Sequence, residues 1–164
     1  MRSRQGGEQA WKGLYAAVSL AGFVLLILGY SAARQVPVVW YVPPAAMRHV
    51  ALLLMLPVFP LLVATYLPGR ISRAAKHPML LAVKLWATAH LLANGMQADV
   101  VLFGALLAWA VADRISLKRR PARPIPAAPA MPINDLVATA LGLMIYVAFV
   151  AALHQVLFGV SPLS

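Results

Sequence analysis

The sequence predicts an all-α fold, a polytopic transmembrane helical bundle of about five spans. Of its 164 residues, 62% are hydrophobic and only 11% are charged, whereas about 25% of the residues in an ordinary soluble domain are charged. A chain of this length cannot bury that much apolar surface against itself, so a large apolar area must face a lipid bilayer. Several apolar runs also approach the roughly 20 residues that a helix needs to cross a bilayer.

Five apolar stretches within a single domain, residues 1–164, account for the predicted spans. They lie at about 14–33, 49–67, 79–94, 99–113 and 136–160. The third and fourth are short for a span, and Asn94-Gly95 between them favours a helix stop followed by a turn. We therefore interpret these two stretches as a tight helical hairpin rather than a re-entrant loop. Pro57 and Pro60 lie inside the second span and predict a kink that serves helix packing.

Two connections are expected to be non-helical. Five prolines recur between residues 116 and 133. No helix or sheet tolerates that density, so this segment is predicted to be an extended, polyproline-like linker. The other connection, residues 34–48, carries Trp40 and Tyr41, whose amphipathic rings suit the headgroup zone of a bilayer.

The basic residues are distributed unevenly between the two sides of the membrane. If the N-terminus is cytoplasmic, eleven lysines and arginines fall on that side, and only Arg34 and Arg48 fall on the other. The eleven are Arg2, Arg4, Lys12, Arg70, Arg73, Lys76, Arg114, Lys118, Arg119, Arg120 and Arg123. This bias predicts a cytoplasmic N-terminus and a periplasmic C-terminus. Because these residues lie at membrane edges and lack interleaved aromatic residues, the expected partner is the lipid bilayer and not nucleic acid.

The sequence excludes several kinds of active site. It contains no cysteine, which excludes disulfides, thiolate metal sites and cysteine nucleophiles. It also lacks a carboxylate pair for hydrolysis, a Gly-rich phosphate loop and an H-E-x-x-H motif. The polar side chains inside the predicted spans remain, and ionisable groups in such places are costly and usually functional.

Histidines are the most informative of these side chains. Trp86, His90 and Asn94 recur at a spacing of four, so they share one face of the third span. In the predicted topology His49, His90 and His154 all belong to the outer half of the membrane. Neutral imidazole is the usual ligand of haem iron, so these three are candidate ligands, with His90 and His154 as the metal pair.

A structural role for His90 is the alternative. In that interpretation the neutral imidazole is hydrogen-bonded across helices, for example to Asn94 or Thr88. An axial pair of His90 and His154 would also require tilt or a short third span, because at 1.5 Å per residue their depths differ by about 12 Å. Lys84, in the third span, either snorkels to the interface or belongs to a buried anion site.

The central block of the chain resembles the NnrU family. The resemblance is carried by LWATAHLLANG at 85–95, KHPM at 76–79 and VLFGALLAWAVADR at 101–114. The upstream segments WKGLYAAVSLAGFVLLILGY and ALLLMLPVFPLLVATYLPG also fit, so it covers nearly the whole chain. It implies a multi-span protein of the bacterial inner membrane that is associated with denitrification, the metabolism of nitrite and nitric oxide.

The 15-cis-zeta-carotene isomerase of plants and cyanobacteria is similar to this family and uses haem b with histidine ligation in the membrane. That kinship implies haem b as the cofactor and adds His77, in the Lys-His-Pro motif, to the candidates. On a straight helix His77 and His90 would lie about 20 Å apart, so they cannot share one iron. Family members usually begin with a further apolar span containing a histidine followed by a serine. No counterpart precedes residue 14 here, as expected of a truncated start or of a shortened member.

Three functions are therefore expected, in this order. The first is a haem-binding accessory or redox protein of nitrogen-oxide metabolism that serves a membrane reductase or its assembly factors. In it His90 is the principal ligand, His154 or His49 is the partner, and Trp86 and Asn94 orient the imidazole. The second is a non-catalytic scaffold or transport subunit, in which the histidines hold helices together. The third is a haem-dependent cis-trans isomerase of a polyene lipid.

Overall fold

The computed structural model describes the fold of residues 2–121 and 125–163, with side chains described from Gly7 onward. The described residues form helices and connections without a named strand, and an isolated bridge pairs Val39 with Met96. The chain divides into two compact units, Met1–Val38 and Val39–Ser164. The all-α prediction is confirmed.

The first unit consists of one long helix, α1 (Arg2–Gln35). Its segment Gly7–Gln35 is long and apolar enough to cross a membrane. The helix begins well before the predicted start of the first span at residue 14. An exposed ion pair joins Lys12 to Glu8 at 2.7 Å, and this spacing of four residues supports the polar N-terminal turns.

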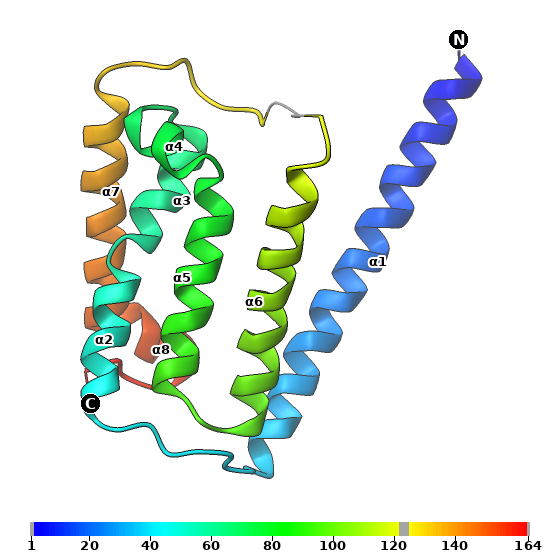
Figure 1. The fold of residues 1–164 in the computed structure, drawn as a ribbon. Coiled ribbons are helices and arrows are strands. Elements are labelled where there is room, and N and C mark those ends of the chain that lie inside the picture. The colour runs from blue at the N-terminus through cyan, green and yellow to red at the C-terminus, as the bar shows by residue number, and fades with distance from the viewer. Residues whose placement is uncertain (1, 122–124, 164) are drawn as a thin grey trace. The chain divides into compact units, whose positions relative to one another are not determined.

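The second unit contains the other helices, which Figure 1 shows in chain order. They are α2 (Ala46–Met55), α3 (Val58–Tyr66), α4 (Arg70–Ala75), α5 (Pro78–Ala93), α6 (Gln97–Leu117), α7 (Asn134–Ala148), the π-helical segment η1 (Phe149–Leu153) and α8 (His154–Phe158). The short helix α4 was not predicted. α5 and α6 are joined by three residues and pack against each other, which confirms the predicted hairpin.

Four helical segments of the described chain have the length and hydropathy of membrane spans. They are Gly7–Gln35, Ala46–Tyr66, Gln97–Leu117 and Asn134–Phe158, and Pro78–Ala93 is a shorter apolar helix. The prediction that the fourth span is short was wrong, because the helix continues through the polar residues at both ends of the apolar run. The linker accordingly starts at Lys118 instead of residue 116, and its described parts are not helical. Residues 122–124 of the predicted linker, with Arg123 among the eleven basic residues, lie outside the described chain.

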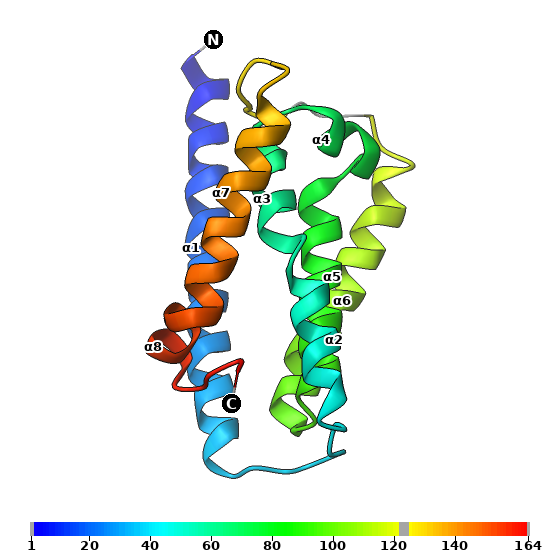
Figure 2. The ribbon, with the colours of Figure 1, turned by 90° about the vertical axis from the view of Figure 1, so that its left-hand side faces the viewer.

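The predicted kink in the second span is a break between α2 and α3. Pro57 precedes α3, and its carbonyl accepts a hydrogen bond from Leu61 N–H at 3.0 Å. Figure 2 shows that α2 and α3 do not share one axis. Pro60, in the first turn of α3, packs directly against Gly142 of α7, where a Cβ atom would overlap the proline backbone. The prolines therefore serve packing, as predicted.

Small side chains fill the helix contacts of the second unit. α3 packs against α5 and α7, and α5 packs against α2 and α6. The buried residues are mainly alanine, including Ala64, Ala82, Ala87 and Ala110, with Val58, Leu61 and Phe103 among the larger ones. The bulky apolar side chains point outward on every long helix. This is the pattern of helices that pack closely and face lipid.

The connection before α2 is fastened to the turn between α5 and α6. Trp40 and Tyr41 donate backbone hydrogen bonds to Gly95 O, and the Tyr41 hydroxyl donates to the carbonyls of Leu91 and Asn94. A Cβ atom on Gly95 would overlap Tyr41 O, so only glycine fits there. Partial burial, followed by the charge of Asp99, raises the pKa of Tyr41. Its hydroxyl therefore keeps the proton that caps the end of α5.

The start of α7 is fastened to α4 in a comparable way. Asp135 accepts hydrogen bonds from the backbone N–H groups of Arg70 and Ile71 at 2.8 and 3.0 Å. Asn134 Nδ2 donates to Pro68 O at 2.9 Å and to Pro129 O at 3.0 Å. The Asp135 bonds satisfy two N-terminal donors of α4 that would otherwise lack partners, and the Asn134 bonds help to fix where α7 begins.

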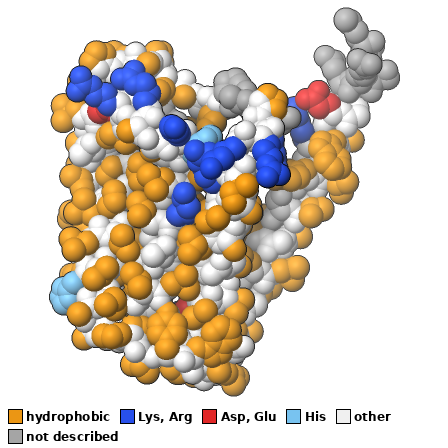
Figure 3. Space-filling model, viewed as in Figure 1, with side chains coloured by type: hydrophobic (Ala, Val, Ile, Leu, Met, Phe, Trp, Pro, Cys, Tyr) orange, Lys and Arg blue, Asp and Glu red, His pale blue; other side chains and the backbone are white. Residues whose placement is uncertain are grey.

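The basic residues of the second unit gather at one end. On the face shown in Figure 3, lysine and arginine side chains cover the ends of α4, α5 and α6. They are Arg70, Arg73, Lys76, Arg114 and Lys118 to Arg120. Arg48, at the start of α2, belongs to the opposite end of the unit. In the second unit the basic residues therefore lie mainly at one end. This is the uneven distribution from which the orientation in the membrane was predicted.

The contact between Pro60 and Gly142 can be tested with a matched pair of substitutions. Gly142→Ala is expected to lower the thermal unfolding temperature in detergent, because the new methyl group overlaps backbone atoms and overpacking costs about 1–3 kcal/mol. Gly104→Ala in α6 meets no atom within 4 Å and should leave stability unchanged or raise it by up to about 1 kcal/mol. Equal stability of the two variants would contradict the observed packing.

Candidate functional site

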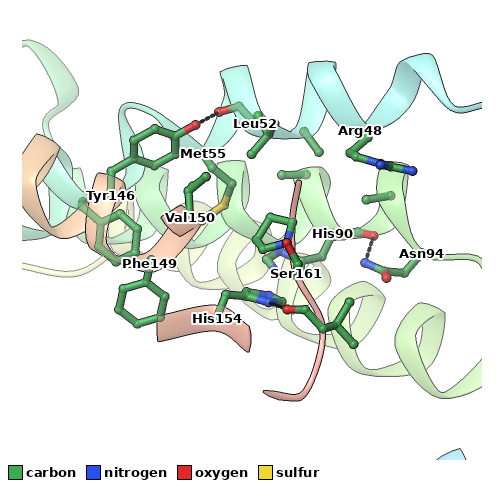
Figure 4. Close-up of a pocket in the computed structure, with 16 residues that line it drawn as sticks. Arg48, Leu52, Met55, His90, Asn94, Tyr146, Phe149, Val150, His154 and Ser161 are labelled. Carbon is green, nitrogen blue, oxygen red and sulfur yellow. Dashed lines mark hydrogen bonds between the residues drawn. The ribbon is translucent and has the colours of Figure 1, made fainter. Parts of the chain in front are cut away.

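The described residues enclose a pocket of about 260 Å³ in the second unit. Its walls come from α2, α5, the end of α7, η1, α8 and residues 160–162, with Phe59 of α3 at one side. In the basic half of the unit α3 fills the space between α5 and α7. In the other half, α2 is displaced at Pro57 and η1 departs from the axis of α7 (Figure 2). The pocket lies in this half, between α2, α5 and η1 (Figure 4).

His90 lines this pocket from the last turn of α5. Its Nδ1 lies 2.9 Å from Trp86 O, one turn earlier on the same helix. A carbonyl oxygen can only accept, so Nδ1 carries the proton, and Nε2 of the neutral ring keeps its lone pair. The imidazole packs against the rings of Phe103, with centroids 4.4 Å apart, and Trp86, at 5.2 Å. The predicted cross-helix hydrogen bond to Asn94 or Thr88 is absent from the described contacts.

His154 lines the same pocket from the first position of α8. It follows η1 directly, and such π-helical turns often occur at functional sites. Gly159 then adopts a left-handed conformation with φ 73°, which reverses the chain. The reversal brings Val160 O to 2.6 Å from His154 Nδ1. As in His90, Nδ1 is the donor and Nε2 keeps a lone pair.

The two imidazoles lie next to each other. Their ring centroids are 6.4 Å apart and their planes are inclined by 28°. The depth difference expected from sequence is closed because α8 turns out of the line of α7 (Figure 1). With a metal–imidazole bond of about 2.0–2.1 Å, as in zinc sites, two rings on one metal have centroids roughly 5–6.5 Å apart. The observed separation falls at the upper end of that range.

The other predicted ligands do not reach this pair. His49 follows Arg48 on α2, about 100° further around the helix, and its side chain is exposed and outside the pocket. His77 precedes α5 at the far end of that helix, and α5 is continuous from Pro78 to Ala93. The structure therefore does not bring His49 or His77 to the pair of His90 and His154. Burial, followed by the Arg114 charge, lowers the pKa of His77.

Two residues predicted to orient the His90 imidazole act differently from expectation. Asn94 donates from Nδ2 to His90 O at 2.9 Å, so its amide caps the helix backbone and does not bind the ring. Trp86 holds the imidazole through its backbone carbonyl, while its indole packs edge-on against Phe103 at 5.1 Å. In the structure the carbonyl of Trp86 thus contacts the His90 ring, whereas the Asn94 amide contacts the backbone.

The structure also places residues that the sequence interpretation passed over. Arg48 lines the pocket beside the histidines, and Tyr146, also in the wall, donates its hydroxyl proton to Leu52 O at 3.1 Å. Asp99, near the start of α6, is a buried carboxylate that is only 6% exposed. Few charged residues lie in the segments that form this end of the unit. That rarity was the signal in the sequence that could have singled out Arg48. Lys84 lies within α5 and is half-buried.

The assigned tautomers can be measured directly. In protein labelled with ¹⁵N-histidine, the ligand-free imidazoles of His90 and His154 are expected to show a protonated Nδ1 and an unprotonated Nε2. The His49 imidazole is exposed and makes no hydrogen bond within the described chain, so it supplies the unconstrained reference. A protonated Nε2 in either pocket histidine would contradict the carbonyl contacts and remove a metal-binding lone pair.

Comparison with known proteins assigns the chain to a family. The NnrU protein family matches residues 1–162, which is nearly the full length. No curated protein and no solved structure matches the chain. The family match spans all the helices described above and includes both pocket histidines. The chain is therefore a member of the NnrU family, with helices of the length and hydropathy that fit a membrane protein.

Proposed function

We propose that this protein binds haem b in the pocket between α2, α5 and α8, with His90 and His154 as the axial ligands. One observation supports this assignment above the others. Both imidazoles line one pocket, with centroids 6.4 Å apart, and both have Nδ1 bound to a backbone carbonyl. A hydrogen bond from the other ring nitrogen to a carbonyl is typical of metal-ligating histidine, because it fixes the ring and leaves Nε2 for the metal.

The donor set favours haem over a bare metal ion. Among the described residues, no group of three or more His, Cys, Asp or Glu side chains could hold a metal. Zinc sites use three or four protein ligands, whereas the haem macrocycle itself supplies four nitrogens and leaves only axial positions to the protein. Two imidazoles in an apolar pocket are therefore sufficient for haem and insufficient for zinc.

The remaining lining also suits a flat, apolar group. Leu52, Met55, Phe59, Phe149 and Val150 supply apolar and aromatic surface. The pocket volume of about 260 Å³ lies just below the roughly 300–1,000 Å³ of ordinary ligand sites. A macrocycle would therefore have to extend beyond the enclosed space. When bound, haem supplies one-electron or diatomic-ligand chemistry, while the protein sets access and potential through these side chains.

We place this activity in nitrogen-oxide metabolism, on the basis of family membership. The protein would serve a reductase of the bacterial inner membrane, or the assembly of one, with its N-terminus cytoplasmic and its C-terminus periplasmic. The gathering of basic residues at one end of the second unit supports that orientation. The pocket histidines would then lie in the outer half of the membrane.

A haem-dependent isomerase of a polyene lipid is the second candidate. Its support is the apolar lining, with Phe59 and Phe149 in contact at a ring separation of 5.1 Å on one wall. A lipid-soluble substrate could reach this pocket from the bilayer. In a deletion strain the two candidates separate: loss of nitrite or nitric oxide reduction supports the first, and altered carotenoid isomer content supports the second.

The axial ligands are tested by absorption spectroscopy. Detergent-purified protein titrated with haemin is expected to give a Soret band typical of low-spin, six-coordinate iron. His90→Ala and His154→Ala should each abolish the low-spin signature and weaken haemin binding by about tenfold or more, since even outer-sphere changes cost that much. His49→Ala and His77→Ala are the matched controls and should behave like the unsubstituted protein.

Two results would contradict the haem assignment. Absence of a Soret band at every haemin concentration would leave the scaffold or transport interpretation, in which the histidines serve packing. Loss of the band in His77→Ala together with its retention in His90→Ala would move the ligand to the opposite end of α5.

A further inference from the structure

We infer that Arg48 anchors a carboxylate, so that the pocket takes an amphipathic acid whose apolar body lies toward Phe149 and whose acid group lies at the start of α2. This inference concerns the pocket to which the proposed function assigns haem, and in that case the carboxylate is a haem propionate. The same chemistry is shared by a free fatty acid. Recognition of the acid group does not itself require iron.

The pocket has two chemically different ends. Figure 4 shows Arg48 and Asn94 at one end, Tyr146 and Phe149 at the other, and the two histidines between them. At the second end Phe59 and Met55 add apolar surface, and the Tyr146 hydroxyl is already bonded to Leu52 O. An occupant that follows this gradient has an apolar body and a single polar end.

Arg48 is the group at the polar end that can bind an anion. The ion pair of the described chain joins Lys12 to Glu8, and Asp135 is bonded to the N-terminus of α4. The Arg48 guanidinium makes neither an ion pair nor a hydrogen bond with a described residue, although it carries five N–H donors. The Asn94 amide at the same end is bonded to His90 O. The unpaired guanidinium therefore has the charge and the donors that a carboxylate requires.

Arg48 lies at the end of the second unit that has few basic residues. The other described lysines and arginines of residues 39–164 lie at the opposite end, except Lys84, which lies within α5. Membrane proteins avoid cations on the outer side, so a cation at this position needs a local explanation. Its position in the wall of a pocket that His90 and His154 also line provides that explanation. The planar guanidinium matches a carboxylate with two parallel hydrogen bonds.

The test compares acids with their esters, which keep the apolar body and lose the charge. Haemin is compared with haemin dimethyl ester by absorbance titration, and oleate with methyl oleate by quenching of tryptophan fluorescence, both on the full-length protein in detergent. Charge-assisted hydrogen bonds contribute about 1.5–3 kcal/mol, so each acid is expected to bind roughly tenfold or more tightly than its ester. In Arg48→Gln that preference should fall to about one, with ester affinity unchanged.

Arg34→Gln is the matched control, because Arg34 is the other basic residue of the predicted outer side and does not line the pocket. It should keep the full preference for the acids. Arg48→Lys should keep part of it, because an ammonium retains the charge but not the paired donors.

Each remaining outcome is decisive. An unchanged acid preference in Arg48→Gln, or a lack of preference in the unsubstituted protein, overturns the anchor and leaves Arg48 as a residue that meets lipid headgroups. Equal loss of acid and ester binding in Arg48→Gln makes Arg48 structural and also overturns it. A response in the oleate pair without any haemin binding supports the anchor while refuting the haem assignment, so the two failures are distinguishable.

Discussion

Unpaired backbone groups cannot be left in lipid, and this constraint organises the second unit. Non-helical or irregular backbone at membrane depth is tolerated where it lines a cavity or is buried in protein. Three irregular segments of the described chain border the pocket: the break at Pro57, η1 and the left-handed turn at Gly159. Met55 and Phe59 flank the first, and Phe149 belongs to the second. The candidate site thus lies where the backbone departs from regular helix.

Most of the fold was predictable, because hydropathy and helix length are local properties. The apolar runs located the spans, Asn94-Gly95 marked the α5–α6 turn, and the proline density excluded helix from most of the linker. The misses occurred where tertiary contacts override local pattern. α4 is too short to carry a hydropathy signal and depends on Asp135, which lies far along the chain. The extension of α6 to Leu117 runs through charged residues that hydropathy alone assigns to a loop.

The site was predictable only in part. His90 and His154 were selected because imidazoles inside apolar runs are costly, and that criterion does not depend on the fold. Their proximity could not be derived from helical rise alone, because it depends on the turn at η1. His49 satisfied the same depth criterion and failed because neighbouring residues on a helix face different directions. Arg48 was counted with the interfacial charges, since its position in the sequence does not reveal that it faces the pocket.

The π-helical segment before His154 has an evolutionary consequence. A single added residue in an α-helix is absorbed by such a widened turn, so losing one residue between Phe149 and Leu153 would restore regular winding. Since the widened turn takes up the extra residue locally, His154 would keep nearly the same direction toward α5 after such a loss. A residue lost from the regular winding of α7 would instead rotate everything downstream by about 100° and shift it by about 1.5 Å, which would turn the imidazole away from α5. The second candidate ligand therefore tolerates a change of length within η1 better than one within α7.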